Sequence, residues 1–200
     1  MIRKATALLL LFGIYTLKAQ IIPADGSKLN YTQVMLEYDK VPDATAYLIQ
    51  MIEDDGIMSF DKPKMEISDN STATLVSNLE FGKKYIWRSC GLYKKKQGEW
   101  NGPYHFEIVN NDAAERLSSV LMKNDTAQCA DGLLTLDHSR LIVDRSGEPV
   151  WYLPPTNDLF SKPHTSDDLR ITDAGTLTFK MGSSVFECNL NGDILWTGPR

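Results

Sequence analysis

Three histidines are the residues of this sequence with the clearest potential for acid–base or nucleophilic chemistry. His105 alternates with Tyr104 and Phe106 in a run typical of a strand, so its side chain is expected on the polar face. His138 and His164 lie among turn-forming residues, and a lone exposed histidine is no indication of catalysis. No nucleophile-elbow motif accompanies them. The sequence therefore assigns no catalytic residue.

The cysteines bear on disulfides and metals. Cys90, Cys129 and Cys188 allow one disulfide in three ways and leave one thiol over, and at least one of them is expected to be a small buried hydrophobic residue. No cysteine lies near another cysteine or a histidine at the spacing of a zinc site. The segment from Asn189 to Asp193 resembles the start of a calcium loop, but it lacks the distal Glu, which favours a plain turn. We expect no metal and no cofactor.

A basic run beside an aromatic residue is a candidate ligand patch. Lys94-Lys95-Lys96 lies close to Trp100 in the chain. The alternative is a solvated loop between two strands, which is the usual setting of such charge runs. The loop interpretation is favoured, and no binding residue is assigned.

The overall charge narrows the classes of function. The 200 residues are 42% hydrophobic and carry 21 basic against 26 acidic side chains, a net charge of -5. A nucleic-acid binder would need a basic stripe to neutralise phosphates, so nucleic acid is not expected as a partner. The apolar content is sufficient for one or two globular domains.

Residues 1–19 have the three parts of a secretory signal peptide. Arg3 and Lys4 precede an apolar stretch of 13 residues, and Ala19 stands where a signal peptidase would cut. The apolar stretch is too short to span a bilayer, which takes about 20 residues. The alternatives are a buried N-terminal helix and an uncleaved anchor. Loss of Arg3, Lys4 and Lys18 leaves 18 basic against 26 acidic residues, a net charge near -8. We expect an exported protein, periplasmic or at the cell surface, with no membrane span after cleavage.

Residues 20–110 consist of short alternating runs separated by turn residues. Runs of this kind, which predict strands, lie at residues 34–38, 47–52, 74–76, 85–90 and 104–109. Repeated short strands with Gly, Pro and Asn turns indicate a β-sandwich.

This segment resembles a fibronectin type III domain. The residues that carry the resemblance are Ala44-x-x-Tyr47-x-Ile49, Leu79-x-x-Gly82-x-x-Tyr85-x-Trp87 and Trp100-x-Gly102-Pro103-x-x-Phe106. Tyr85 stands where such sandwiches place a corner tyrosine, whose hydroxyl bonds to nearby backbone. Tyr38 occupies a position where the family often has a core tryptophan. The resemblance implies one sandwich of about 90 residues.

Residues 111–126 connect this segment to the next. Leu117, Val120 and Leu121 share one face at helical spacing, which predicts a short helix. A flexible coil linker is the alternative.

Residues 127–200 contain an internal repeat. Asp144-x-x-Gly147-x-x-x-Trp151 aligns with Asn189-x-x-Gly192-x-x-x-Trp196 at an offset of 45 residues, and a further strand precedes each copy, at 132–136 and 175–179. In each copy an apolar strand enters a turn whose glycine supplies positive φ, and the next strand ends in tryptophan. A period of this length with about four strands per unit indicates β-propeller blades. The alternative is two unrelated hairpins.

The repeat region also resembles the opening blades of bacterial arylsulfate sulfotransferases, over about 70 residues. The match begins at Leu141-Ile142-Val143-Asp144, passes through Gly147-x-x-Val150-Trp151-Tyr152 and Asp168-Leu169-Arg170-Ile171-Thr172, and ends at Gly192-x-Ile194-x-Trp196. Those enzymes are exported, place a small sandwich before a six-bladed propeller, and move a sulfuryl group between phenols through a sulfohistidine. Similar Asx-x-x-Gly-x-x-x-Trp repeats occur in quinone-dependent dehydrogenase propellers and in non-enzymatic scaffold propellers.

The sequence thus predicts an all-β chain: a fibronectin type III or immunoglobulin-like sandwich followed by an incomplete β-propeller of one to two blades. The resemblance implies the N-terminal portion of an exported arylsulfate sulfotransferase-like protein, with aryl sulfate and phenol as partners of the full-length form. Its catalytic residues would lie in later blades, so this truncated piece is expected to be inactive. The alternative is a secreted or cell-surface scaffold that recognises glycans or proteins. No pattern in the sequence specifies an oligomeric state.

Overall fold

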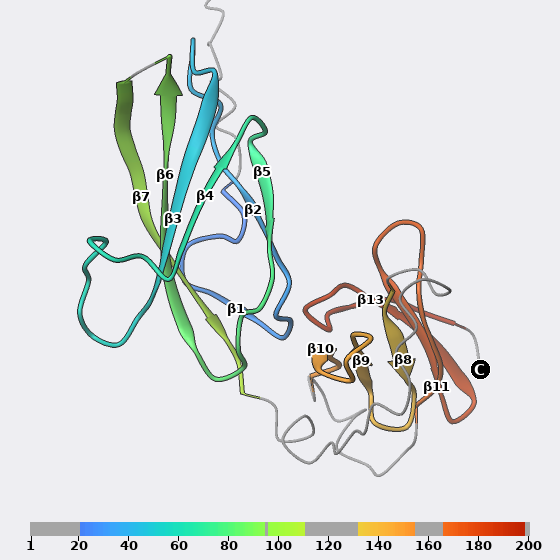
Figure 1. Cartoon of the computed structure of the whole chain (residues 1–200). Coiled ribbons are helices and arrows are strands. Elements are labelled where there is room, and N and C mark those ends of the chain that lie inside the picture. The colour runs from blue at the N-terminus through green and yellow to red at the C-terminus, as the bar shows by residue number, and fades with distance from the viewer. Residues whose placement is uncertain (1–20, 95, 111–131, 155–165, 199–200) are drawn as a thin grey trace, which may run out of the picture.

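The computed structural model describes residues 21–94, 96–110, 132–154 and 166–198 (Figure 1). Every regular element within these ranges is a β-strand, so the all-β prediction is confirmed. The predicted signal peptide at 1–19 and the predicted joint at 111–126 lie outside the described residues.

Two sheets that share one core make up the first part of the chain. The larger sheet has the strand order β1-β7-β6-β3-β4, and the smaller sheet pairs β2 with β5. All neighbouring strands are antiparallel except β1, which runs parallel to β7. The strands are β1 Ser27–Leu29, β2 Val34–Glu37, β3 Ala46–Glu53, β4 Met65–Asp69, β5 Ala73–Val76, β6 Lys84–Tyr93 and β7 Lys96–Ile108.

Alternation along the strands decides which side chains enter this core. In β2, Val34 and Leu36 are buried while Met35 between them is exposed. In β7, Phe106 and Ile108 are buried, as their spacing predicts. Since successive side chains of a strand point to opposite faces, each sheet has one apolar face. Both faces contribute to one cluster of buried side chains, which gives the sandwich its core.

Aromatic rings fill the centre of the sandwich. Trp87 and Tyr85 are fully buried, with ring centroids 5.0 Å from Tyr104 and 5.4 Å from Phe106 respectively. The Tyr85 hydroxyl accepts a hydrogen bond from the backbone N–H of Glu80 at 2.9 Å. The predicted corner tyrosine is therefore confirmed.

Tyr38 is a second aromatic core residue that the sequence singled out. It is buried, and its ring lies edge-on to Tyr47 at 5.2 Å and to Trp87 at 6.3 Å. Its hydroxyl donates to the backbone carbonyl of Ser71 at 2.9 Å. The sandwich thus keeps a core tryptophan on β6, with Tyr38 packed beside it.

The sequence did not predict β1, β4 or the first half of β7. β1 has three residues, and none of the five residues of β4 is fully buried, so neither shows a clear apolar pattern. In β7, Gly102 and Pro103 interrupt the alternation, and the register with β6 shifts twice. Short edge strands and irregular strands leave weak periodic signals.

Residues 132–154 and 166–198 form two further antiparallel sheets. One has the order β10-β9-β8 and the other the order β11-β12-β13-β14, so strands that follow one another in the chain are neighbours. The strands are β8 Leu134–Leu136, β9 Leu141–Val143, β10 Pro149–Tyr152, β11 Ser166–Ile171, β12 Leu177–Met181, β13 Ser184–Cys188 and β14 Ile194–Thr197. Both sheets are meanders.

The predicted repeat is present in the pairing of these strands. Trp151 pairs with Ile142 between β10 and β9, and Trp196 pairs with Glu187 between β14 and β13, 45 residues later. The pairs on either side repeat with the same offset. The two hairpins therefore have one common register.

Three hairpin turns also share one hydrogen-bond pattern. They start at Asp144, Thr172 and Asn189. In each turn the N–H of the first residue donates to the carbonyl of the fifth residue, and the N–H of the fourth residue donates to the carbonyl of the first. The fourth residue has a positive φ in every case: 83° for Gly147, 76° for Gly175 and 85° for Gly192. Glycine adopts this conformation without steric cost. The sequence predicted two of these turns, and the structure adds the third.

The two meanders pack together through Trp151. This side chain is buried, and its Nε1 donates to the backbone carbonyl of Leu190 at 2.7 Å. Apolar side chains from both sheets form a second core around it, which includes Ile142, Leu177 and Phe179. The first meander is thereby attached to the Asn189 turn of the second.

Candidate functional site

A joint between the sandwich and the first meander positions the candidate site. Residues 30–32 lead from β1 to β2 and lie along β10. The N–H of Thr32 donates to the carbonyl of Val150 at 2.9 Å, and the N–H of Tyr152 donates to the carbonyl of Asn30 at 3.2 Å. The buried Nδ2 of Asn30 also donates to the carbonyl of Tyr152 at 2.6 Å. Main-chain and side-chain hydrogen bonds thus join the two parts.

Aromatic contacts reinforce this joint. Tyr31 forms an antiparallel bridge with Trp151, and its side chain packs against both cores. The ring of Phe81 lies edge-on to that of Tyr152 at 5.7 Å, and the Tyr152 hydroxyl donates to the carbonyl of Asn110 at 3.3 Å. Polar and apolar contacts therefore fix the same segment from two sides.

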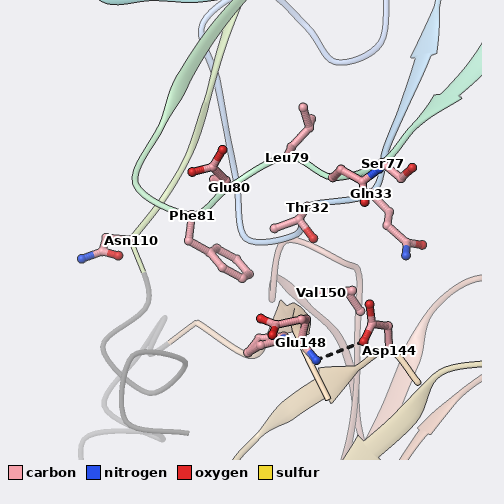
Figure 2. Close-up of a pocket in the computed structure, with 12 residues that line it drawn as sticks. Thr32, Gln33, Ser77, Leu79, Glu80, Phe81, Asn110, Asp144, Glu148 and Val150 are labelled. Carbon is pink, nitrogen blue, oxygen red and sulfur yellow. Dashed lines mark hydrogen bonds between the residues drawn. The ribbon is translucent and has the colours of Figure 1, made fainter. Parts of the chain in front are cut away.

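A pocket of about 490 Å³ opens beside the joint (Figure 2). The sandwich forms one wall through residues 32–33 and 77–81, and the turn between β9 and β10 forms the other. Amide, hydroxyl and carboxyl groups line it together with apolar side chains: Thr32, Gln33, Ser77, Asn78, Leu79, Glu80, Phe81, Asn110, Asp144, Glu148, Pro149 and Val150.

Three carboxylates belong to this lining, and two of them have partners. Asp144 accepts hydrogen bonds from the N–H groups of Ser146 and Glu148 at 2.8 and 3.0 Å, the second of which is drawn in Figure 2. Glu80 forms an ion pair with Lys64 at 3.1 Å. The exposed carboxylate of Glu148 forms no ion pair with a described residue. Asp144 therefore stabilises the turn, while Glu148 is available to a ligand.

The charge of the pocket selects the class of ligand. None of the twelve described residues that line it is Lys, Arg or His. Glu80 is neutralised by its ion pair with Lys64, so the excess negative charge comes from Asp144 and Glu148, which form no ion pair with a described residue. This charge favours cations and disfavours anions such as sulfate esters. Its amides and hydroxyls suit a neutral ligand rich in hydroxyl groups. A nucleophile beside a basic group, which covalent catalysis needs, is not formed by these residues.

The described histidines lie away from this pocket. The Nδ1 of His105 is 3.1 Å from the Oδ1 of Asp25, and its backbone N–H donates to the same oxygen at 2.7 Å. These hydrogen bonds, the backbone one above all, lower the pKa of Asp25. His138 is exposed in the turn between β8 and β9, as predicted. His164 lies outside the described residues.

The basic and aromatic cluster is organised differently from the candidate patch. Lys94 is exposed in the turn between β6 and β7, in agreement with the loop interpretation, whereas the exposed Lys96 is the first residue of β7. Lys95 lies outside the described residues. Trp100 instead stacks on Arg88, whose Cζ is 4.0 Å from the ring centroids of both Trp100 and Phe60. Phe60 comes from a distant loop, so this arrangement could not be predicted from the local sequence.

Cys90 and Cys188 are buried free thiols, which confirms the prediction of at least one small buried cysteine. Burial raises the pKa of the Cys188 thiol to about 11. Cys129 lies outside the described residues.

The Asn189 segment is a plain turn, as predicted. The Oδ1 of Asn189 accepts the N–H of Asp193, and its Nδ2 donates to the Asp193 carboxylate, both at 2.9 Å. Among the residues that the structure describes, His, Cys, Asp and Glu form no group that could hold a metal ion.

The pocket itself was not predicted from the sequence. Its walls come from segments more than a hundred positions apart, such as Thr32 and Val150. Only the pairing of residues 30–32 with β10 brings them together. The Asx-x-x-Gly pattern around Asp144 predicted the turn that forms one wall, and no local signal pointed to the other.

No helix in the described ranges is both long and apolar enough to cross a bilayer. No family model matches this chain, and a search of the curated proteins found no relative of it. The chain is accordingly placed by its architecture, as an all-β protein in which a sandwich is joined to two stacked meanders.

Proposed function

We propose that the chain is the N-terminal portion of an exported arylsulfate sulfotransferase-like protein, in which a sandwich precedes the first blades of a β-propeller. The observation that supports this most strongly is the common register of the β9–β10 and β13–β14 hairpins. Successive antiparallel meanders of about four strands with a fixed repeat are the building units of propellers. In the described residues the second meander has four strands and the first has three. The resemblance of residues 141–196 supplies the chemistry of the proposal.

In the proposed reaction a histidine nitrogen attacks the sulfur of an aryl sulfate, and the phenolate leaves with the electron pair of the broken S–O bond. The oxygen of a second phenol then attacks the sulfohistidine, loses its proton to a base, and regenerates the histidine. Cationic groups must hold the anionic sulfuryl oxygens during both steps. Because the pocket at the joint is acidic, we place the donor site in later blades and give the described residues the role of framework.

A transfer assay on the full-length protein tests this proposal. The protein is incubated with phenyl sulfate and a second phenol, and mass spectrometry detects the new sulfate ester and a sulfated histidine peptide. We expect both products. His105→Ala and His138→Ala serve as matched controls and should retain full transfer, since neither lines a pocket suited to sulfate. A folded protein that forms no ester would refute the sulfotransferase proposal, and loss of transfer in either control would refute the framework role.

Export is a separate part of the proposal and has its own test. The gene is expressed with its own leader in a bacterial host, and the N-terminus of the protein from the periplasm is determined by mass spectrometry. Cleavage after Ala19 should give a chain that begins at Gln20. Recovery of the chain from the cytoplasm with residues 1–19 intact would contradict export.

The acidic pocket favours a second candidate function, binding of a neutral glycan by a secreted or cell-surface protein. Glycans offer hydroxyl groups to carboxylates and amides, and their apolar ring faces pack on aromatic side chains such as Phe81. The pocket at the joint provides these groups together.

A glycan array probed with the mature chain tests this second function. We expect binding to neutral glycans, weakened by Glu148→Gln, since the Glu148 carboxylate, unlike those of Glu80 and Asp144, has neither an ion pair nor a hydrogen bond with a described residue. Glu99→Gln is the matched control, because Glu99 is an exposed carboxylate on β7. Equal effects of the two substitutions, or no binding to any neutral glycan, would exclude this pocket as a glycan site.

A further inference from the structure

One large aromatic side chain of the second meander is uncovered in the described structure. Trp196 is 51% exposed, whereas Trp151, at the same place in the preceding repeat, is 3% exposed. Local structure does not cause this difference, since both residues occupy the same position in the common register. The difference lies in what covers each indole.

The backbone presents the two indoles in the same way. The N–H of Leu153, two residues after Trp151, donates to the carbonyl of Arg140 at 2.9 Å. Forty-five residues later, the N–H of Gly198 donates to the carbonyl of Val185 at 2.8 Å. Each tryptophan is therefore held on a strand whose end is fixed by an equivalent hydrogen bond.

The indole of Trp196 also has a defined position. It lies over Gly198, where a Cβ would stand 2.9 Å from a ring carbon. A side chain at this position would displace the ring, so glycine provides the space that the ring occupies. Trp196 is thus exposed but already oriented.

The surroundings of Trp151 show what an indole at this position binds. Its Nε1 donates to the carbonyl of Leu190, the second residue of the turn that starts at Asn189. Its ring joins the core formed by the apolar face of the following meander, with Leu177 and Phe179. The structure that covers the Trp151 indole is therefore one Asx-x-x-Gly turn together with the sheet to which that turn belongs.

We infer that Trp196 is the docking residue for a third meander of the same repeat, whose Asx-x-x-Gly turn accepts the indole N–H through the carbonyl of its second residue. This inference rests on the proposed propeller. The direction of stacking agrees with it: Phe186 and Cys188 point into the core shared with the first meander, so Glu187 and its cross-strand partner Trp196 face the other way.

Glu187, the cross-strand partner of Trp196, restricts which meander can dock on this face. Glu187 stands where the first meander has the buried Ile142, and its carboxylate accepts the hydroxyl of Thr176 at 2.6 Å. A covered carboxylate needs further hydrogen bonds, so the third meander must present a donor opposite Glu187. A second copy of this chain is a poorer occupant: the Leu190 carbonyl of its Asn189 turn already accepts its own Trp151, and its Asp144 turn lies opposite the sandwich across the pocket.

Hydroxyl-radical footprinting with mass spectrometry tests this inference on the tryptophans directly. In the 200-residue chain, Trp196 should be oxidised faster than Trp151. In the full-length protein, the rate at Trp196 should fall to the rate at Trp151. Rapid oxidation of Trp196 in both proteins would overturn the inference. Protection of Trp196 in the 200-residue chain that disappears on dilution would also overturn it, because the occupant would then be a second copy.

Thermal unfolding of paired variants provides a second measurement. Trp196→Ala should lower the Tm of the full-length protein and leave that of the 200-residue chain unchanged, whereas Trp151→Ala should lower both. Trp196→Phe keeps an aromatic ring and Glu187→Gln keeps the size of the side chain, so both should give smaller losses, in the full-length protein alone. Equal effects of Trp196→Ala in the two proteins would overturn the inference. If the full-length protein transfers sulfuryl groups while Trp196 stays exposed, the inference fails and the proposed sulfotransferase function stands. If Trp196 is protected but no transfer occurs, the sulfotransferase function fails and the inference stands.

Discussion

Tyr85 stabilises the sandwich through its hydroxyl as well as its ring. The fully buried ring stacks on Phe106, while the hydroxyl accepts the N–H of Glu80 at the corner before β6. Trp87, two residues away, is buried with an indole N–H that has no hydrogen-bond partner among the described residues. Tyrosine at 85 thus joins core packing to a backbone hydrogen bond, whereas Trp87 contributes packing alone.

Replacing Tyr85 with Phe should lower the free energy of unfolding by about 1 kcal/mol, the usual contribution of one hydrogen bond. The ring and its packing are kept, so the loss reports the hydroxyl. Urea denaturation measures it. Tyr93→Phe is the matched control, since Tyr93 lies at the β6–β7 hairpin outside the core cluster, and it should be close to neutral. Equal losses of unfolding free energy for the two variants would show that the Tyr85 hydroxyl does not stabilise the corner before β6.

The Cys188 thiol should be protonated and unreactive in the native protein. Burial raises its pKa to about 11, above that of an exposed thiol, so the neutral form is favoured by folding. The associated stability is present at neutral pH and is lost as the pH rises through about 11. Reaction with a thiol-specific disulfide reagent at pH 8 should be slow until urea is added. Rapid labelling of the peptide that contains Cys188 without urea would contradict this.

At the scale of elements, hairpin turns set the geometry of the meanders. Each turn places a glycine at positive φ, and an Asp, Asn or Thr side chain accepts the N–H of the fifth residue. An L-residue with a side chain is strained in this conformation, since its Cβ approaches a backbone oxygen. The turn glycines are therefore expected to matter even where space is available.

Gly175→Ala and Gly132→Ala separate backbone strain from steric clash. A Cβ would have no neighbour within 4 Å at either position, but only Gly175 has a positive φ, of 76°. We expect Gly175→Ala to lower the free energy of unfolding by about 1–2 kcal/mol through backbone strain. Gly132→Ala should be neutral or slightly stabilising. Urea denaturation compares the two, and equal effects would show that strain at the turn is not the cause.

Elements with strong alternation were predictable from the sequence, and those without it were not. β2 and the end of β7 follow a two-residue period because one face is buried and the other is solvated. β1 and β4 are short and partly exposed, so tertiary pairing rather than local pattern makes them strands. The pocket and the Phe60–Arg88–Trp100 stack depend on contacts between distant segments, for which a single sequence contains no signal.

At the scale of the whole molecule, residues 30–32 serve two structures at once. They are the connection between β1 and β2 of the sandwich, and they pair with β10 of the first meander. Tyr31 packs against both cores. We therefore expect the sandwich and the first meander to behave as one cooperative unit.

Asn30→Ala should weaken this coupling. The substitution removes the buried hydrogen bond from Nδ2 to the Tyr152 carbonyl, and a buried acceptor left unsatisfied costs about 1–3 kcal/mol. Unfolding should then separate into two transitions, observed by calorimetry, and proteases should cleave between the parts more readily. Asn70→Ala, at an exposed asparagine between β4 and β5, is the matched control and should keep one transition. A single unchanged transition for Asn30→Ala would contradict the cooperative unit.

The pairing of residues 30–32 with β10 also has a consequence for solubility. β10 is the outermost strand of its sheet, and the free edge of a sheet can recruit strands from other molecules. Here the carbonyl of Val150 and both backbone groups of Tyr152 are already bonded to Asn30 and Thr32. A loop of the sandwich thereby shields that edge against self-association, so the N-terminal domain protects the meander that follows it.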